Sequence, residues 1–103
     1  MTQLKGTLKH GVKIGDGDKA KILKDYILRP ATTADYFAAE DDSPITKHLS
    51  FKGAMIGRQL VKLGDLSGPI DFKIIGKMEI EDFNHLVDQL KVIEDMGKET
   101  PSD

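Results

Sequence analysis

Two runs of residues near the start of the chain alternate between apolar and polar side chains, and a glycine-rich turn separates them. In residues 4–14 the large apolar side chains fall on even positions, which places them on one face of a β-strand. Residues 20–28 continue an even-numbered apolar face that includes Ile22 and Tyr26. The turn between the runs contains Asp16-Gly17, a pair typical of tight hairpins. The pattern predicts an N-terminal β-hairpin, which is marginal alone and must cover helices from the rest of the chain.

A change of local structure is predicted at Arg29-Pro30. Proline lacks the N–H that a strand ladder needs, so the second strand ends there. Thr32 and Asp35 have the spacing of a variant capping box, which predicts a short helix that ends in acidic residues at 40–42. We also expect Arg29 to pair with Asp35 and to lock the junction between hairpin and helix.

Three further helical segments are predicted. Ser43-Pro44 has the form of an N-cap followed by proline at the first helical position, and apolar residues at helical spacing follow over 45–63. Gly53 and Gly57 lie inside this segment and would allow close helix packing, or Ser50 would restart the helix. After a loop over 65–69, a short helix is expected over 71–76. The clearest amphipathic pattern spans 79–96.

The length allows one domain with one core. The chain has 103 residues, of which 39% are hydrophobic, so its buried core is modest. We therefore predict an α+β fold in which an N-terminal β-hairpin is followed by three to four α-helices, packed as a single small domain over residues 1–97. The polar residues 98–103 are expected to form a disordered tail.

Charge and composition narrow the classes of partner. The net charge is −2, but residues 1–29 carry +4 and residues 30–103 carry −6. Opposite charges on the two parts could steer a partner, or they could be solvated polar faces. The pI near 5.9 argues against a dedicated nucleic-acid binder. No segment resembles a signal peptide or membrane span, so we expect no membrane partner and a cytoplasmic location.

No arrangement of residues typical of catalysis is present in the sequence. The chain has no cysteine, no nucleophile motif and no phosphate-binding glycine loop. His85 lies three residues from both Asp82 and Asp88, a spacing that fits a surface ion pair better than a metal site. We therefore predict a protein that is not an enzyme and that has no cofactor, no catalytic residue and no metal site.

The segment Tyr26-Ile27-Leu28-Arg29-Pro30-Ala31-Thr32-Thr33-Ala34-Asp35, with the later pattern Met78-x-x-x-Asp82-x-x-x-Leu86, resembles a known family. It is similar to the small tail assembly chaperones of contractile-tailed, Mu-like and P2-like phages. In that family a strand ends in Arg-Pro-x-Thr, and a helix with an early aspartate follows. The ordered match covers about residues 4–95, although methionine stands where the family's later pattern has leucine.

The resemblance implies a non-catalytic role in a phage or prophage. Such chaperones are thought to coat the long tape measure protein in the host bacterial cytoplasm before the tail tube polymerises, and to be absent from the finished virion. The resemblance also leaves open that the chain binds a frameshifted longer form of itself or forms a homo-oligomer. The resemblance does not decide the phage type.

A chaperone for a long helical protein needs exposed apolar surface, and one helix-like stripe is our candidate for it. The predicted partner-binding residues are Phe51, Met55, Ile56, Leu60 and Leu63. The alternative is that these side chains form the core.

Two other functions stay open. The chain could be a small structural or connector protein that remains in the phage tail. Less favoured is a small nucleic-acid-binding regulator that uses the basic hairpin.

Overall fold

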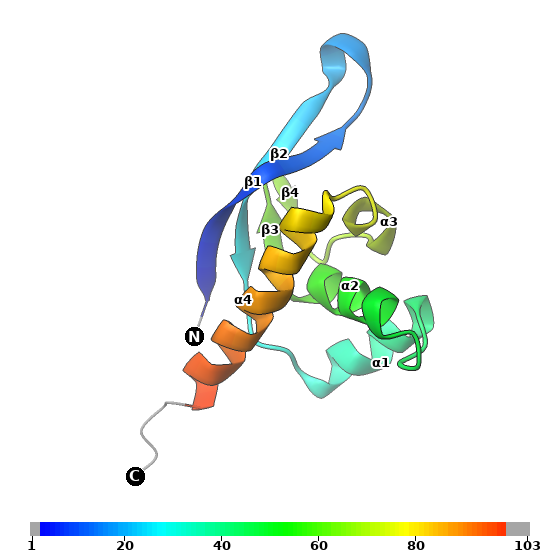
Figure 1. Cartoon of the computed structure of the whole chain (residues 1–103), viewed down its shortest axis with the longest axis vertical. Helices are drawn as coiled ribbons and strands as arrows, with labels where there is room; N and C mark the ends of the chain where they lie inside the picture. The colour runs from blue at the N-terminus through cyan, green and yellow to red at the C-terminus, as the bar shows by residue number, and fades with distance from the viewer. Residues whose placement is uncertain (1–2, 99–103) are drawn as a thin grey trace.

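A computed structural model describes residues 3–98 and shows a four-stranded antiparallel sheet with four helices. Strands β1 (Leu4–Ile14) and β2 (Lys21–Leu28) form the hairpin, whose tip contains a single 3-10 turn. The tip projects away from the helices and gives the molecule a long axis of 54 Å (Figure 1). The predicted α+β class with an N-terminal hairpin is confirmed.

The junction after β2 has the structure that the sequence predicted. Helix α1 (Thr33–Asp42) begins with a capping box in which the Thr32 hydroxyl accepts from the Asp35 N–H and the Asp35 carboxylate accepts from the Thr32 N–H. The Arg29 guanidinium donates two hydrogen bonds to the Asp35 carboxylate, at 2.7 and 2.8 Å. The predicted Arg29–Asp35 pair is therefore confirmed.

The predicted helix start at Ser43-Pro44 is wrong. Ser43 ends α1, because its N–H donates to the Ala39 carbonyl. Residues 44–47 form a turn, closed by a hydrogen bond from the Lys47 N–H to the Pro44 carbonyl. Helix α2 (His48–Gln59) starts only after this turn and has no side-chain cap.

The predicted helix over 45–63 is too long. Residues Leu60–Leu63 form strand β3, which pairs with β2, and Leu66–Ser67 form the short strand β4 inside the predicted loop. Leu60 lies opposite Leu28, and Leu63 lies opposite Tyr26. Both leucines are buried in this arrangement. The segment forms a strand because the edge of β2 offers backbone hydrogen-bond partners, which a helix would leave unpaired.

The last two helices follow the sequence pattern. Helix α3 (Phe72–Ile75) ends at Gly76, and α4 (Ile80–Lys98) crosses the sheet and packs on β1 and α2 (Figure 1). A core forms between the sheet and the helices from β1, β2, α2, β3, the segment around α3, and α4. Its buried members are Leu8, Val12, Leu23, Tyr26, Leu28, Ile56, Leu60, Leu63, Ile70, Ile75, Leu86 and Ile93. The tail was predicted to begin at residue 98, but Lys98 is the last residue of α4, and residues 99–103 lie outside the described residues.

The even-numbered apolar face predicted for the hairpin breaks in β2. Residues 4–7 pair with 25–28 and residues 12–14 pair with 21–23, so residues 8–11 of β1 bulge opposite Lys24 alone. Gly11 supports the bulge with a φ of +83°, a conformation that favours glycine. As a result Leu23 is buried, whereas Ile22 is 61% exposed.

Candidate functional site

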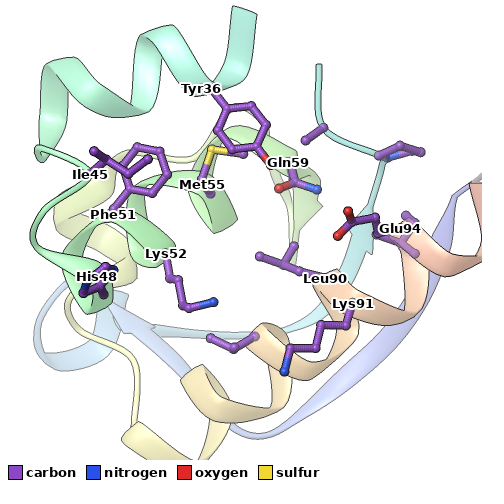
Figure 2. Close-up of a pocket in the computed structure, with 14 residues that line it drawn as sticks. Tyr36, Ile45, His48, Phe51, Lys52, Met55, Gln59, Leu90, Lys91 and Glu94 are labelled. Carbon is purple, nitrogen blue, oxygen red and sulfur yellow. The ribbon is translucent and has the colours of Figure 1, made fainter. Parts of the chain in front are cut away.

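A groove lies between α1, α2 and α4, and its volume is about 470 Å³ (Figure 2). Helices α1 and α2 are in contact with each other and form one wall, and residues 87–94 of α4 form the other. The groove is lined mainly by apolar and aromatic side chains, with a few charged and polar groups. The lining residues are Pro30, Ala31, Tyr36, Ile45, His48, Phe51, Lys52, Met55, Gln59, Val87, Leu90, Lys91, Ile93 and Glu94.

Two of the five predicted partner-binding residues line this groove. Phe51 and Met55 are 8% and 5% exposed and belong to a small second core cluster between α1 and α2. Ile56, Leu60 and Leu63 are at most 1% exposed and pack in the main core. The structure thus places the five residues in two separate regions. The three residues in the main core have the surroundings expected if these side chains form the core and do not bind a partner.

Aromatic and aliphatic groups extend the apolar surface of the groove to its rim. The Tyr36 ring stacks on the Phe51 ring, with centroids 6.1 Å apart and an angle of 25° between the planes. Tyr36 and Ile45 remain 47% and 53% exposed. On the opposite wall, Val87 and Leu90 are only partly buried against the main core. These side chains could bury further apolar area only against another molecule or a moved segment of the chain.

Two lysines border the groove from opposite walls. Figure 2 shows the Lys52 side chain reaching from α2 into the opening and the Lys91 side chain on the α4 side. Both residues are exposed, and no ion pair to either is seen within residues 3–98. Glu94, which also lines the groove, takes part in an interaction of its own.

A buried charged cluster holds the start of α1 against the end of α2. Asp35 is 1% exposed, accepts both Arg29 hydrogen bonds, and lies 3.5 Å from the Arg58 Nε. Hydrogen bonding from Arg29 is the main cause that lowers the pKa of Asp35 from 3.8 to about 2, and Thr32 contributes in the same direction. The cluster therefore stays charged at neutral pH and fixes the angle between the two helices.

Backbone contacts complete this junction. The Arg29 N–H donates to the Gln59 carbonyl at 3.0 Å, and the Gln59 side-chain amide donates to the Arg29 carbonyl at 3.0 Å. Arg29 also donates to the Arg58 carbonyl at 2.9 Å. Because these bonds join the end of β2 to the end of α2, they set the position of the wall that carries Phe51 and Met55.

A second cluster fixes α4, the other wall, to the hairpin. The buried Asp82 carboxylate accepts hydrogen bonds from the backbone N–H groups of Lys9, His10 and Gly11, at 2.9, 3.1 and 2.9 Å. These donors are the bulged residues of β1. The neighbouring Glu81 accepts from the side chains of His10 and Lys9, whose hydrogen bonds lower its pKa.

The histidine considered for metal binding has another partner. His85 Nε2 lies 2.8 Å from the Tyr26 hydroxyl, and the two rings meet edge to face. Asp82, its neighbour on the helix, accepts hydrogen bonds from the β1 backbone. Within the described part of the chain, no three histidine, aspartate or glutamate side chains gather in a way that could hold a metal ion. None of the described helices is long and apolar enough to cross a membrane.

Sequence reasoning missed most of the residues that make the groove. Val87 and Leu90 belong to the amphipathic pattern over residues 79–96. Their spacing does not show that the apolar face of this helix is wider than the core that it covers. Tyr36, Lys52 and Lys91 carry no local pattern at all. Their grouping depends on the angle between helices that are far apart along the chain.

The chain is similar to two proteins of Escherichia phage Mu. It is 29% identical, over 77% of its length, to a probable tail assembly protein, gp41, and equally to the probable tail assembly protein FS-gp41. It spans 62% of the first relative and about half, 48%, of the second. These relatives confirm the resemblance to phage tail assembly proteins. No family model matches the chain, and no solved structure is significantly similar to it.

Proposed function

We propose that this relative of phage tail assembly proteins is a non-catalytic chaperone, which binds the tape measure protein during tail morphogenesis and is absent from the mature virion. The observation that carries the proposal is the similarity to two tail assembly proteins over 77% of the chain. The role is set in the cytoplasm of the host bacterium, where tails assemble.

The lining of the groove supports a binding role. Its floor is apolar, and its walls add a few charged and polar side chains, among them Lys52 and Lys91. A surface of this kind holds an apolar helix by burial. Several copies of the chain along one long target would add avidity without high affinity at each site. Such weak contacts suit a chaperone that the tail tube must later displace.

The test is co-expression with the tape measure protein encoded in the same gene cluster. With an affinity tag on this chain, we expect the tape measure protein to co-purify, and to be soluble only when the two are expressed together. An unrelated tagged protein of similar size is the control. A tape measure protein that is soluble alone and does not co-purify would remove the basis of the proposal.

A structural or connector protein of the tail is the competing function. Mass spectrometry of purified particles separates the two, because a chaperone leaves before the tail is complete. We expect tail-tube peptides in abundance and no peptide of this chain. Its presence at a fixed stoichiometry in mature particles would favour the connector.

A further inference from the structure

The geometry points to the groove between α1, α2 and α4 as the docking site for a helix of the partner, one whose apolar stripe is flanked by carboxylates. This inference rests on the proposed function, since the partner is the tape measure protein. It adds the place of binding on this chain and the chemistry of the segment that is bound.

The apolar part of the inference comes from the shape and lining of the groove. Phe51 and Met55 form the floor on the α2 side, and Val87 and Leu90 face them from α4. A groove between two helical walls accepts a third helix, which presents side chains at i, i+3, i+4 and i+7. Tyr36 and Ile45 at the rim would lose their exposed apolar area to the same ligand.

The charged part of the inference comes from Lys52 and Lys91. A helix in the groove would shield both ammonium groups from water, which costs free energy unless each receives an opposite charge. Neither lysine has an ion-pair partner within residues 3–98, and Glu94 is already engaged. Carboxylates on the two sides of the ligand's apolar stripe would meet this requirement, and a basic ligand would be repelled.

A second copy of this chain is the competing occupant. The outer face of α4 carries the exposed Val92 and Met96, with Asp88 and Asp95 nearby in sequence, so it also combines apolar and acidic groups. Its apolar content is small, however, because these two side chains are only 40% and 37% exposed. We therefore assign the groove to the tape measure protein and leave self-association as an outcome of the test.

The experiment uses fluorescent peptides of about 25 residues, roughly seven helical turns, that tile the tape measure protein of the same gene cluster. Binding to the full chain is measured by anisotropy. The test variant is the double charge reversal Lys52→Glu with Lys91→Glu. The matched control is Lys13→Glu with Lys19→Glu, two exposed lysines of the projecting hairpin (Figure 1).

A second pair of variants tests the apolar contact. Ile45→Ser changes an exposed isoleucine at the groove rim, and Ile22→Ser changes one of similar exposure on the hairpin. Both sites are on the surface, so both variants are expected to fold.

We expect the bound peptides to be those with an apolar stripe flanked by acidic residues. The groove reversal should weaken their binding about ten-fold or more, and Ile45→Ser should weaken it several-fold, while both controls stay within about two-fold. Replacing the flanking acids of a bound peptide by lysine should restore its binding to the groove reversal.

The results distinguish failure of the inference from failure of the proposed function. If peptides bind and the groove reversal binds them as tightly as wild type, the chaperone role stands and the groove assignment is wrong. If neither the peptides nor the whole tape measure protein binds the wild type, both fail. If sedimentation shows a dimer that the groove reversal dissociates, a second copy occupies the groove and the inference is overturned.

Discussion

Asp35 connects three parts of the chain through one carboxylate. It caps α1 by accepting from the Thr32 N–H, pairs with Arg29 at the end of β2, and lies near Arg58 in α2. The residue is almost fully buried, so its charge is stable only with these partners. Its lowered pKa means that folding is favoured while the carboxylate is ionised.

Replacement of this residue should change both stability and its dependence on pH. The pKa falls from 3.8 to about 2, so the pairing adds about 2 kcal/mol to the free energy of unfolding above pH 4. That contribution is lost as the pH falls toward about 2. We expect Asp35→Asn to be less stable at neutral pH by about 2 kcal/mol or more, and to lose less stability than wild type on acidification.

Urea unfolding followed by circular dichroism at several pH values from about 5 to about 2 measures the effect. Asp18→Asn, on the exposed hairpin turn, is the matched control and should follow the wild-type curve. Parallel curves for wild type and Asp35→Asn would show that the buried pair does not control acid stability.

Two glycines of α2 occupy different surroundings, although the sequence presents them as equivalent. A Cβ atom at Gly57 would lie 2.5 Å from the Ile70 carbonyl oxygen, and the Ile70 N–H donates to the Gly57 carbonyl at 2.9 Å. A Cβ at Gly53 would meet its nearest neighbour, Phe72, at 3.4 Å, an ordinary contact. The close approach at Gly57 is thus to the backbone at Ile70, which lies outside any helix, and not to a second helix.

The two alanine variants should therefore change stability in opposite directions. Gly53→Ala should raise the free energy of unfolding by up to about 1 kcal/mol, because alanine is the better helix former. Gly57→Ala should lower it by about 1–3 kcal/mol, because backbone must move to admit the methyl group. Urea titrations of the two variants beside wild type give the comparison. Equal effects would mean that the segment around residue 70 moves freely.

The bulge of β1 and the N-terminal turn of α4 depend on each other. Three consecutive backbone N–H groups leave the strand ladder at the bulge, and the Asp82 carboxylate accepts from all of them. An irregular strand is thereby paired with a helix terminus far away in sequence. This contact determines where α4 crosses the sheet, and so where one wall of the groove stands.

Asp82→Asn should release this contact. An asparagine offers one acceptor oxygen and turns an amide toward the other N–H groups, so we expect a loss of about 2 kcal/mol. Hydrogen exchange at the Lys9, His10 and Gly11 amides should become faster than in wild type. The adjacent Glu81→Gln is the control, because Glu81 is exposed and ion pairs between exposed side chains contribute little to stability. Unchanged exchange in Asp82→Asn would contradict the role of this carboxylate.

The uneven charge along the chain is partly neutralised within the fold. Lys9 pairs with Glu81 at 3.1 Å, and Lys21 pairs with Asp65 at 2.8 Å, so the basic hairpin meets acidic residues of the later segments. Lys52 and Lys91 at the groove form no ion pair with an acidic residue of the described part of the chain. Positive charge therefore remains beside the apolar groove, where Lys52 and Lys91 would flank a bound helix.

Binding of the tape measure peptides should accordingly depend on salt. Raising the ionic strength from about 0.1 M to about 1 M shortens the screening length from about 10 Å to about 3 Å. We expect the affinity of wild type to fall several-fold over this range, because two exposed ion pairs are screened. The Lys52→Glu, Lys91→Glu variant should not weaken further with salt. Isothermal titration at each salt concentration checks this, and a salt-independent wild type would exclude paired lysines.

The hairpin, the capped start of α1 and the amphipathic α4 could all be predicted from the chain alone. Each depends on short-range signals: a period of two, an Asp-Gly turn, a Thr-x-x-Asp cap, and a period of 3.6. The Arg29–Asp35 pair belongs with them, because its members are six residues apart and the predicted turn brings them together.

Strand β3, the β1 bulge and the groove could not be predicted in this way. Leu60 and Leu63 fit a helical stripe as well as a strand, and the edge of β2 decides between the two by offering backbone hydrogen bonds. In the sequence, Asp82 is an aspartate in the first turn of a predicted helix, and nothing indicates that it accepts hydrogen bonds from the bulge of β1. Hydrogen bonds between segments far apart in the sequence decide these structures. They could not be predicted because a short stretch of sequence contains only one of the two bonding partners.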